Sequence, residues 1–360
     1  MLFTPFVIIK MNSYGRKHIR HENYKLFRFI KMATTKSLSV LAIDGCISSA
    51  ITGLIDSLHL ANVFWLTAPE SEGAPLFNVS ICSINGEQVT ASGGVILNPE
   101  NSIEDINTPD LIMVPAFLPP FDVTCNSYKP VYKWLKESYN KGSIIASTCT
   151  GTFLLAESGL LDGKSATTNW FFANKFRKEY PRVNLNIDKV VVEDQRLISS
   201  GAATAFMNLC LYFIEKFGST GLASLCAKAL LIDPDKQSQS PYMLHDFWKS
   251  HLDSQILEAQ NWMENNFSNK ISIDDIAENA GISPRHFKRR FKKATNETPI
   301  AYLQHLRIER AKHLLENSLD TINEITWQVG YEDINSFRRL FKKHTDVSPK
   351  EFRNKFARTA

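Results

Sequence analysis

The sequence predicts two domains of different fold class, an α/β domain followed by an all-α domain. The chain of 360 residues is longer than one ordinary hydrophobic core needs, which indicates more than one domain. As far as residue 232, short runs of branched apolar side chains alternate with segments of helical spacing. This alternation is typical of a parallel sheet covered by helices. Beyond residue 252, apolar residues recur only at helical spacing.

The composition is that of a soluble globular protein, with 44% hydrophobic and 22% charged residues. No apolar run approaches the roughly 18 to 20 residues that span a bilayer, so we expect no membrane partner and a cytoplasmic location. The 6 cysteines lie singly, without CxxC spacing, which indicates neither a metal site nor a disulfide framework. Reduced thiols fit the cytoplasm, and no motif indicates a cofactor.

Residues 1–36 are predicted to form a disordered basic extension, because they contain many lysines and arginines but a single acidic residue, Glu22. The apolar stretch "LFTPFVII" precedes these charges, which is the reverse of the order in a secretory signal peptide. Met32 is therefore a candidate start of the biological chain.

Four apolar runs in the first domain are predicted to be buried strands, because continuous branched runs suit a sheet covered on both faces. They lie at 37–43, 78–84, 110–116 and 143–147. Helical spacing occupies 50–65, 128–140 and 152–160, and a strand pair at 189–201 precedes apolar helices over 202–232. These elements predict a flavodoxin-like parallel sheet with flanking helices over 37–232. A polar, proline-bearing linker at 233–252 then leads to an all-α domain at 253–357.

The all-α domain contains an internal repeat. Residues 276–295, "IAENAGISPRHFKRRFKKAT", match residues 325–345, "ITWQVGYEDINSFRRLFKKHT", at a separation of about 50 residues. Each copy has a short helix, a glycine turn and a second helix opened by a capping or turn residue, Ser283 or Asp333. The sequence therefore predicts two helix-turn-helix motifs.

The second helix of each copy has a predicted inner and outer face. The two phenylalanines of each helix are four residues apart and share the inner face. The outward side chains are Arg285, Lys288, Arg289, Lys292 and Lys293 in the first copy and Asn335, Arg338, Arg339, Lys342 and Lys343 in the second. Arginine can read guanine and asparagine adenine, whereas the lysines suit phosphates. Such charged faces are most often merely solvated, but residues 285–293 carry only basic charges.

Residues 253–357 resemble the AraC family of transcriptional regulators. The similarity rests on the two glycine turns, the two "F…F-K-K" helices, "TPIAYLQHLRIERAKHLL" (298–315) and "SPKEFR" (348–353). It implies a domain whose two recognition helices enter successive major grooves of double-stranded DNA, with RNA polymerase as a candidate partner. Asn296 and Asp346 stand where glycine is usual after the recognition helix, which leaves the geometry of these turns open.

The stretch "IIASTCTGTFLL" (144–155) places Cys149 at a tight turn between a strand and a helix. This is the geometry of a nucleophile elbow. The following helix dipole is expected to favour the thiolate, so we expect Cys149 to be alkylated faster than the other cysteines. Catalysis also requires a base within hydrogen-bond reach.

Residues 37–218 resemble the class I glutamine amidotransferase-like superfamily, in its PfpI branch, and most closely the GlxA-type subgroup, in which such a domain precedes an AraC-type module. The similarity is most specific in "CTGTFLLAESGLLDGKSATTNW" (149–170). Catalytic relatives place histidine after the cysteine or at a nearby strand end, where this chain has Thr150 and Asn169. In "DGCISSAITG" (44–53), Ser48, Ser49 and Ala50 stand where the regulators usually carry an aspartate. Cys149 is therefore interpreted as a degenerate nucleophile position and the protein as not an enzyme.

The same turn is predicted to form a ligand pocket of Cys149, Thr150, Asn169 and Trp170. Parallel sheets bind ligands at this edge, where helix N–H groups attract anions, and Trp170 could hold a cationic amine. Related regulators often respond to amino-acid or betaine-like metabolites. We therefore expect a homodimeric, DNA-binding transcriptional regulator that senses a small metabolite. The alternatives are a PfpI-type cysteine amidohydrolase or deglycase with a DNA-binding module, a redox-sensing thiol, and an inert buried cysteine; His59 and His245 are the remaining candidate bases.

Overall fold

The computed structural model describes residues 34–357 except 246, 248 and 250. Most of the predicted extension, including Met32, lies outside the described residues. The first strand, β1 (Lys36–Leu41), begins one residue before the predicted start of the domain. Within the described part of the chain, no helix is long and apolar enough to cross a lipid bilayer.

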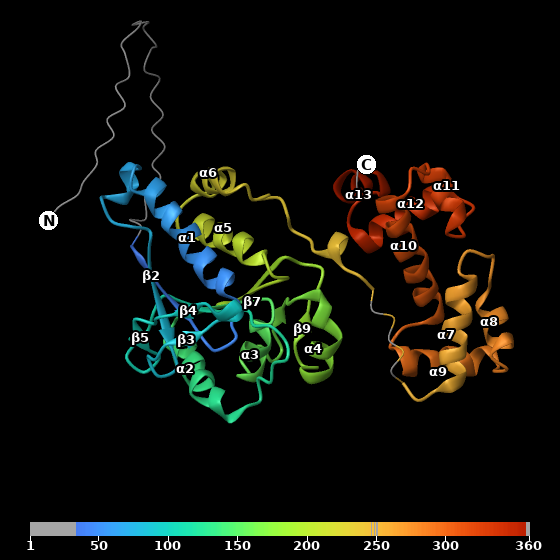
Figure 1. The fold of residues 1–360 in the computed structure, drawn as a ribbon, viewed down its shortest axis with the longest axis horizontal. Coiled ribbons are helices and arrows are strands. Elements are labelled where there is room, and N and C mark those ends of the chain that lie inside the picture. The colour runs from blue at the N-terminus through green and yellow to red at the C-terminus, as the bar shows by residue number, and fades with distance from the viewer. Residues whose placement is uncertain (1–33, 246, 248, 250, 358–360) are drawn as a thin grey trace, which may run out of the picture. The chain divides into compact units, whose positions relative to one another are not determined.

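The first domain is built on a seven-stranded sheet, as the alternating pattern predicts (Figure 1). Its strands in spatial order are β10 (Val191–Asp194), β11 (Leu197–Ser200), β7 (Ile144–Thr148), β6 (Leu111–Val114), β1, β2 (Phe77–Ser83) and β5 (Asn101–Ser102). All neighbours are parallel except the hairpin β10–β11. The central strand β6 is buried at every residue, which explains its continuous apolar run.

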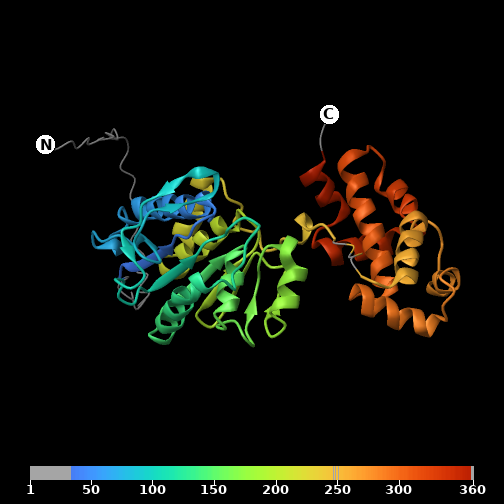
Figure 2. The ribbon, with the colours of Figure 1, turned by 60° about the horizontal axis from the view of Figure 1, so that its bottom comes forward.

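Helices cover both faces of this sheet (Figure 2). On one face α1 (Ser48–Trp65), α5 (Ala205–Phe217) and α6 (Thr220–Leu230) pack together, and α2 (Lys129–Asn140) and α3 (Gly151–Glu157) pack together against β7 on the other. The predicted α/β class is therefore confirmed. The sequence pattern missed α4 (Ala173–Glu179) and the two-residue strands, which are too short to show a periodicity: β5 and also β3 (Val89–Thr90), β4 (Ile96–Leu97), β8 (Ser165–Ala166) and β9 (Asn184–Leu185).

The second domain is helical throughout its described residues, as predicted. Its helices are α7 (Ser254–Asn266), α8 (Ile273–Asn279), α9 (Pro284–Thr295), α10 (Pro299–Asn317), α11 (Ile322–Gln328), α12 (Ile334–Thr345) and α13 (Pro349–Phe356). The pairs α8–α9 and α11–α12 are the two helix-turn-helix motifs. Each has its own hydrophobic core, and we call these the first lobe and the second lobe.

One helix, α10, belongs to both lobes. Its N-terminal half gives Tyr302, Leu303 and Leu306 to the first core, and its C-terminal half gives Ile308, Ala311, Leu314 and Leu315 to the second. Between the two halves, the guanidinium of Arg307 donates to the carbonyls of Phe267, at 2.8 Å, and Asn269, at 3.0 Å. The same guanidinium lies 5.1 Å from the centre of the Tyr331 ring in the second lobe. Arg307 therefore links the lobes on the surface of the helix that they share.

The two glycine turns are conformationally alike but packed differently. Gly281 has a φ of +64° and Gly330 a φ of +83°, both in the left-handed region where a Cβ is strained. A Cβ on Gly281 would meet nothing within 4 Å. A Cβ on Gly330 would lie 2.8 Å from the carbonyl oxygen of Ser268 and 2.9 Å from that of Phe267. The second turn therefore also serves as the point where the second lobe touches the backbone of the first.

This difference predicts unequal costs for two equivalent substitutions. Gly281→Ala should lower the free energy of unfolding of the helical domain by about 1–2 kcal/mol, which is the cost of the left-handed conformation. Gly330→Ala should cost clearly more, because the backbone of Ser268 must also move. Urea unfolding of both variants, followed by helical circular dichroism, measures the difference. Equal losses would show that the lobes do not rely on this approach.

Candidate nucleic-acid interface and cysteine elbow

The recognition helices α9 and α12 have the two faces that their sequences predict. Phe287 and Phe291 of α9 and Phe337 and Phe341 of α12 are all 0% exposed. The outward side chains are exposed without exception: Arg285, Lys288, Arg289, Lys292, Lys293, Asn335, Arg338, Arg339, Lys342 and Lys343. Each helix therefore presents one strongly basic face to solvent, and burial of the phenylalanines fixes which face that is.

The ends of the two recognition helices use different residues for the same conformations. Asp333 caps α12, because its carboxylate accepts hydrogen bonds from the backbone N–H groups of Asn335 and Ser336. Ser283 is the N-cap residue of α9, as predicted, but its side chain makes no capping hydrogen bond. At the other ends, Asn296 and Asp346 adopt left-handed φ values of 62° and 60°. Short polar side chains tolerate this conformation, which is why glycine is dispensable there.

Two neighbouring arginines of α9 have different surroundings. Arg289 is exposed and lies 3.2 Å from the His286 ring, one turn earlier. Arg290 is half-buried and forms a bidentate pair with Asp253 at the start of α7, with distances of 3.0 and 2.6 Å, and also donates to Gln255. Hydrogen bonds from Arg290 lower the pKa of Asp253. Arg290 therefore holds α9 to α7, and Arg289 remains available to a ligand.

Cys149 occupies the predicted elbow between β7 and α3. It has a left-handed φ of 53°, which is rare for a residue other than glycine, asparagine or aspartate. The Nδ2 of Asn169 lies 3.4 Å from its sulfur. The hydroxyl of Thr150 donates to the Phe117 carbonyl at 2.7 Å and accepts from the Phe117 N–H at 2.8 Å. The structure thus brings together three of the four predicted pocket residues. The fourth, Trp170, begins a 3₁₀ turn and packs against the Phe171 ring.

The electrostatics of this elbow differ from the sequence prediction. Cys149 is only 3% exposed, and burial raises the pKa of its thiol despite the contacts with Asn169 and Thr150. The following helix α3 has only 7 residues. Neither candidate base is close: His59 is exposed on α1, and His245 lies beside Glu297 of the helical domain. The expected thiolate at Cys149 is therefore wrong.

The thiol with the opposite character is Cys125, which precedes α2. It is exposed, and a hydrogen bond from the Ser127 hydroxyl, 3.2 Å from its sulfur, lowers the pKa of the thiol. A lower pKa and free access both favour reaction with electrophiles. Sequence reasoning missed Cys125, because a serine two residues after a cysteine is not a recognised signal.

Hydrogen bonds connect the elbow to the linker. The hydroxyl of Thr168 donates to the carbonyl of Cys149 at 2.6 Å. The side-chain amide of Gln239, a linker residue that is only 3% exposed, donates to the carbonyl of Thr168 at 3.0 Å and to the Thr167 hydroxyl at 3.1 Å. Its carbonyl oxygen accepts from the N–H of Ala202 at 3.0 Å. Sequence reasoning missed Gln239, because it lies in a polar segment that reads as a simple connection.

Comparison with known proteins identifies both halves of the chain. Residues 70–216 match the DJ-1/PfpI family, and residues 276–355 match a helix-turn-helix domain. The chain thus contains a DJ-1/PfpI match followed by a helix-turn-helix match, in the order that its sequence motifs predict.

Two similar proteins match most of this chain. The HTH-type transcriptional regulator CdhR of Pseudomonas aeruginosa is 23% identical over 314 residues, which cover 87% of this chain and 90% of CdhR. The HTH-type transcriptional regulator GbdR of the same species is 23% identical over 321 residues, 88% of this chain and 84% of GbdR. Among solved structures, an AraC family transcriptional regulator from Pseudomonas putida matches with a TM-score of 0.47 and 18% identity, over 54% of this chain and 99% of that one.

The two thiols should differ in reactivity in the native protein. Under limiting iodoacetamide at neutral pH, Cys125 should be alkylated well before Cys149, because one thiol is exposed with a lowered pKa and the other is buried with a raised pKa. Peptide mass spectrometry over a time course measures the order, and unfolded protein is the control in which the two rates converge. Faster native labelling of Cys149 would restore the sequence-based expectation.

Proposed function

We propose that this protein is a sequence-specific, DNA-binding transcriptional regulator whose α/β domain senses a small metabolite. One observation supports the first part above all others. Two helix-turn-helix motifs in one domain each bury a pair of phenylalanines and present an exposed basic face. Arginine and asparagine on those faces suit base edges, and the flanking lysines suit phosphates. The regulator names of the relatives CdhR and GbdR agree with this proposal. As a regulator of this kind, the protein would act as a homodimer in the cytoplasm and contact RNA polymerase at its promoter.

The neighbouring arginines of α9 provide a matched test. Arg289→Ala should weaken binding to the cognate operator by about 1–3 kcal/mol and relax preference at one base position, with an unchanged melting temperature. Lys292→Ala should weaken binding to all sequences alike and reduce the salt slope by about one. Arg290→Ala should instead lower the melting temperature, because it releases Asp253. Operators selected from genomic fragments and binding measured by fluorescence anisotropy provide the readout. Equal losses on operator and random DNA for Arg289→Ala would contradict the base-reading role.

The second part of the proposal places the effector at the elbow, against Cys149, Thr150 and Asn169, with Trp170 as a candidate wall. The hydrogen-bonded path from Cys149 through Thr168 to Gln239 supports this placement, because it gives a bound molecule a physical connection to the linker. A zwitterionic metabolite of the amino-acid or betaine class suits an amide donor beside an aromatic wall.

Gln239 offers a test of that connection. Gln239→Ala should keep operator affinity but lose most of the change in affinity that the effector causes, because the amide that couples Thr168 to the linker is gone. Gln237→Ala is the matched control, since that side chain is exposed and only its backbone carbonyl is used. Amino acids and betaines are first screened by thermal shift. An effector response that survives in Gln239→Ala would rule out this path.

The alternative function is a cysteine hydrolase carrying a DNA-binding module. The strained φ of Cys149 favours it, since catalytic elbows share that conformation. Burial of the thiol, its raised pKa, and the amide and hydroxyl where a base is required argue for the regulator. Measured hydrolysis of amides or glycated substrates that disappears in Cys149→Ala would support the enzyme.

A further inference from the structure

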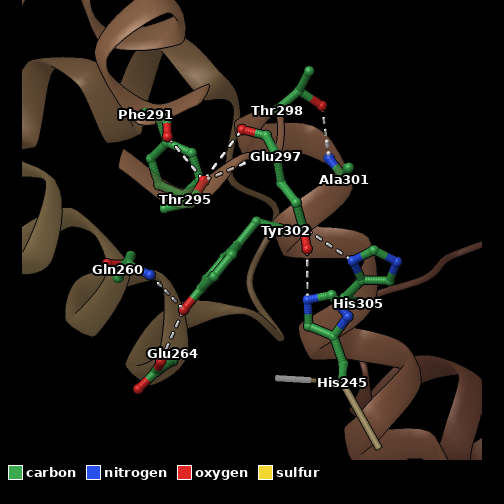
Figure 3. A network of polar contacts seen from close by, with 10 residues as sticks. All are labelled: His245, Gln260, Glu264, Phe291, Thr295, Glu297, Thr298, Ala301, Tyr302 and His305. Atoms are coloured by element: carbon green, nitrogen blue, oxygen red, sulfur yellow. Dashed lines mark hydrogen bonds and ion pairs between the residues drawn. The ribbon is translucent and has the colours of Figure 1, made fainter. Parts of the chain in front are cut away.

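Three residues that are distant in the sequence lie close together beside the N-terminal half of α10. His245 comes from the linker, Glu297 from the loop after α9, and His305 from α10 (Figure 3). The Nε2 of His245 lies 2.9 Å from one carboxylate oxygen of Glu297, and the Nδ1 of His305 lies 3.0 Å from the other. The ligand atoms of all three residues lie within 4.8 Å of one another.

One of these atoms lacks a hydrogen bond. The Nε2 of His245 is buried and within ion-pair distance of Glu297, but it makes no hydrogen bond. Buried ring nitrogens are normally hydrogen-bonded or bound to a metal. The two imidazole rings are stacked, with centroids 3.9 Å apart and planes inclined by 27°, so that both face the same carboxylate.

From this geometry we propose that His245, Glu297 and His305 bind one Zn²⁺ ion, with water as the fourth ligand. Two imidazole nitrogens and a carboxylate are a known ligand set for zinc. Zinc lies about 2.0–2.2 Å from such atoms, which places tetrahedral ligands roughly 3.3 Å apart. The two nitrogens lie 2.9 and 3.0 Å from different oxygens of Glu297, so binding of one ion requires the rings and the carboxylate to shift until the three ligand atoms reach that spacing.

The charges around the cluster are mixed. Glu297 supplies a carboxylate, and the His344 ring lies beside His305, with centroids 4.7 Å apart. Lys312 and Lys343 line the same cavity as the two histidines, and Glu309 pairs with Lys312 at 2.7 Å.

A bound ion would fasten the linker to the helical domain. His245 is followed by Phe247, whose ring packs on Tyr302 at the start of α10, with centroids 5.1 Å apart. Glu297 follows α9 directly, so the ion would join the linker to the end of a recognition helix. The sequence indicated no metal site, because the three proposed ligands are far apart between positions 245 and 305 and follow no spacing motif.

The test uses the full chain, stripped with a chelator and titrated with Zn²⁺ and, separately, with Co²⁺ as a spectroscopic probe. We expect one ion per chain, a higher melting temperature, and a cobalt spectrum of nitrogen and oxygen ligands without a thiolate charge-transfer band. His305→Ala and Glu297→Gln should each weaken binding by at least about 100-fold, since even loss of a supporting residue costs about 10- to 100-fold. His245→Ala should do the same, and its position in the linker leaves the fold of the helical domain intact.

The matched control is His313→Ala, which removes an exposed histidine from the same helix α10 and should leave metal binding unchanged. The metal-free variants are compared with the metal-free protein by circular dichroism, so that a folding defect is separated from loss of a ligand. Three outcomes would overturn the proposal: no binding of Zn²⁺ or Co²⁺ in slight excess over protein, full binding by both His305→Ala and Glu297→Gln, or a thiolate band that places the metal on cysteine.

Discussion

The geometry of the helical domain depends on one constraint, namely that both halves of α10 are buried, each in a different core. A helix shared in this way cannot bend or slide in one lobe without disturbing the other. Arg307 and the close approach of Gly330 to the first lobe act at the middle of that helix and reinforce it. The two recognition helices are thereby held as a pair, which is what a reader of two adjacent DNA segments requires. Their basic faces follow from the buried phenylalanines, because a helix fixed on one side has only one side left for solvent.

Most of this architecture is local in the sequence and could be predicted from it. Alternating apolar runs gave the sheet, and phenylalanines four residues apart gave the inner faces of α9 and α12. The charged residues were harder to assign, because their roles depend on partners elsewhere in the chain. Arg289 and Arg290 are adjacent and chemically identical, yet only Arg290 has Asp253 within reach. Nothing in the spacing of α9 reveals that carboxylate, since it is supplied by the start of α7.

The elbow shows the same limit for a different reason. The strand, the turn and the helix that place Cys149 are visible in the sequence, and the left-handed conformation follows from them. The reactivity of the thiol depends on its pKa, which is set by the electrostatic effect of the helix and by its exposure to water. Burial of the sulfur is a tertiary property, and it raises the pKa of the thiol despite the hydrogen bonds from Asn169 and Thr150. The fold therefore positions a cysteine at a strained turn while its burial keeps the thiol largely out of contact with water.

The linker is divided between the two domains by its contacts. Gln239 completes the interior of the α/β domain, whereas Phe247 packs against the core of the first lobe and Tyr242 packs on Phe356 of α13, with ring centroids 5.2 Å apart. The junction between these contacts is therefore much shorter than the polar segment, and it falls between Gln239 and Tyr242. Exchange of whole domains among related proteins, in evolution or in the laboratory, would preserve both interiors only if the crossover falls within those few residues. A crossover upstream of Gln239 would remove the buried side-chain amide that hydrogen-bonds to Thr168 next to the elbow.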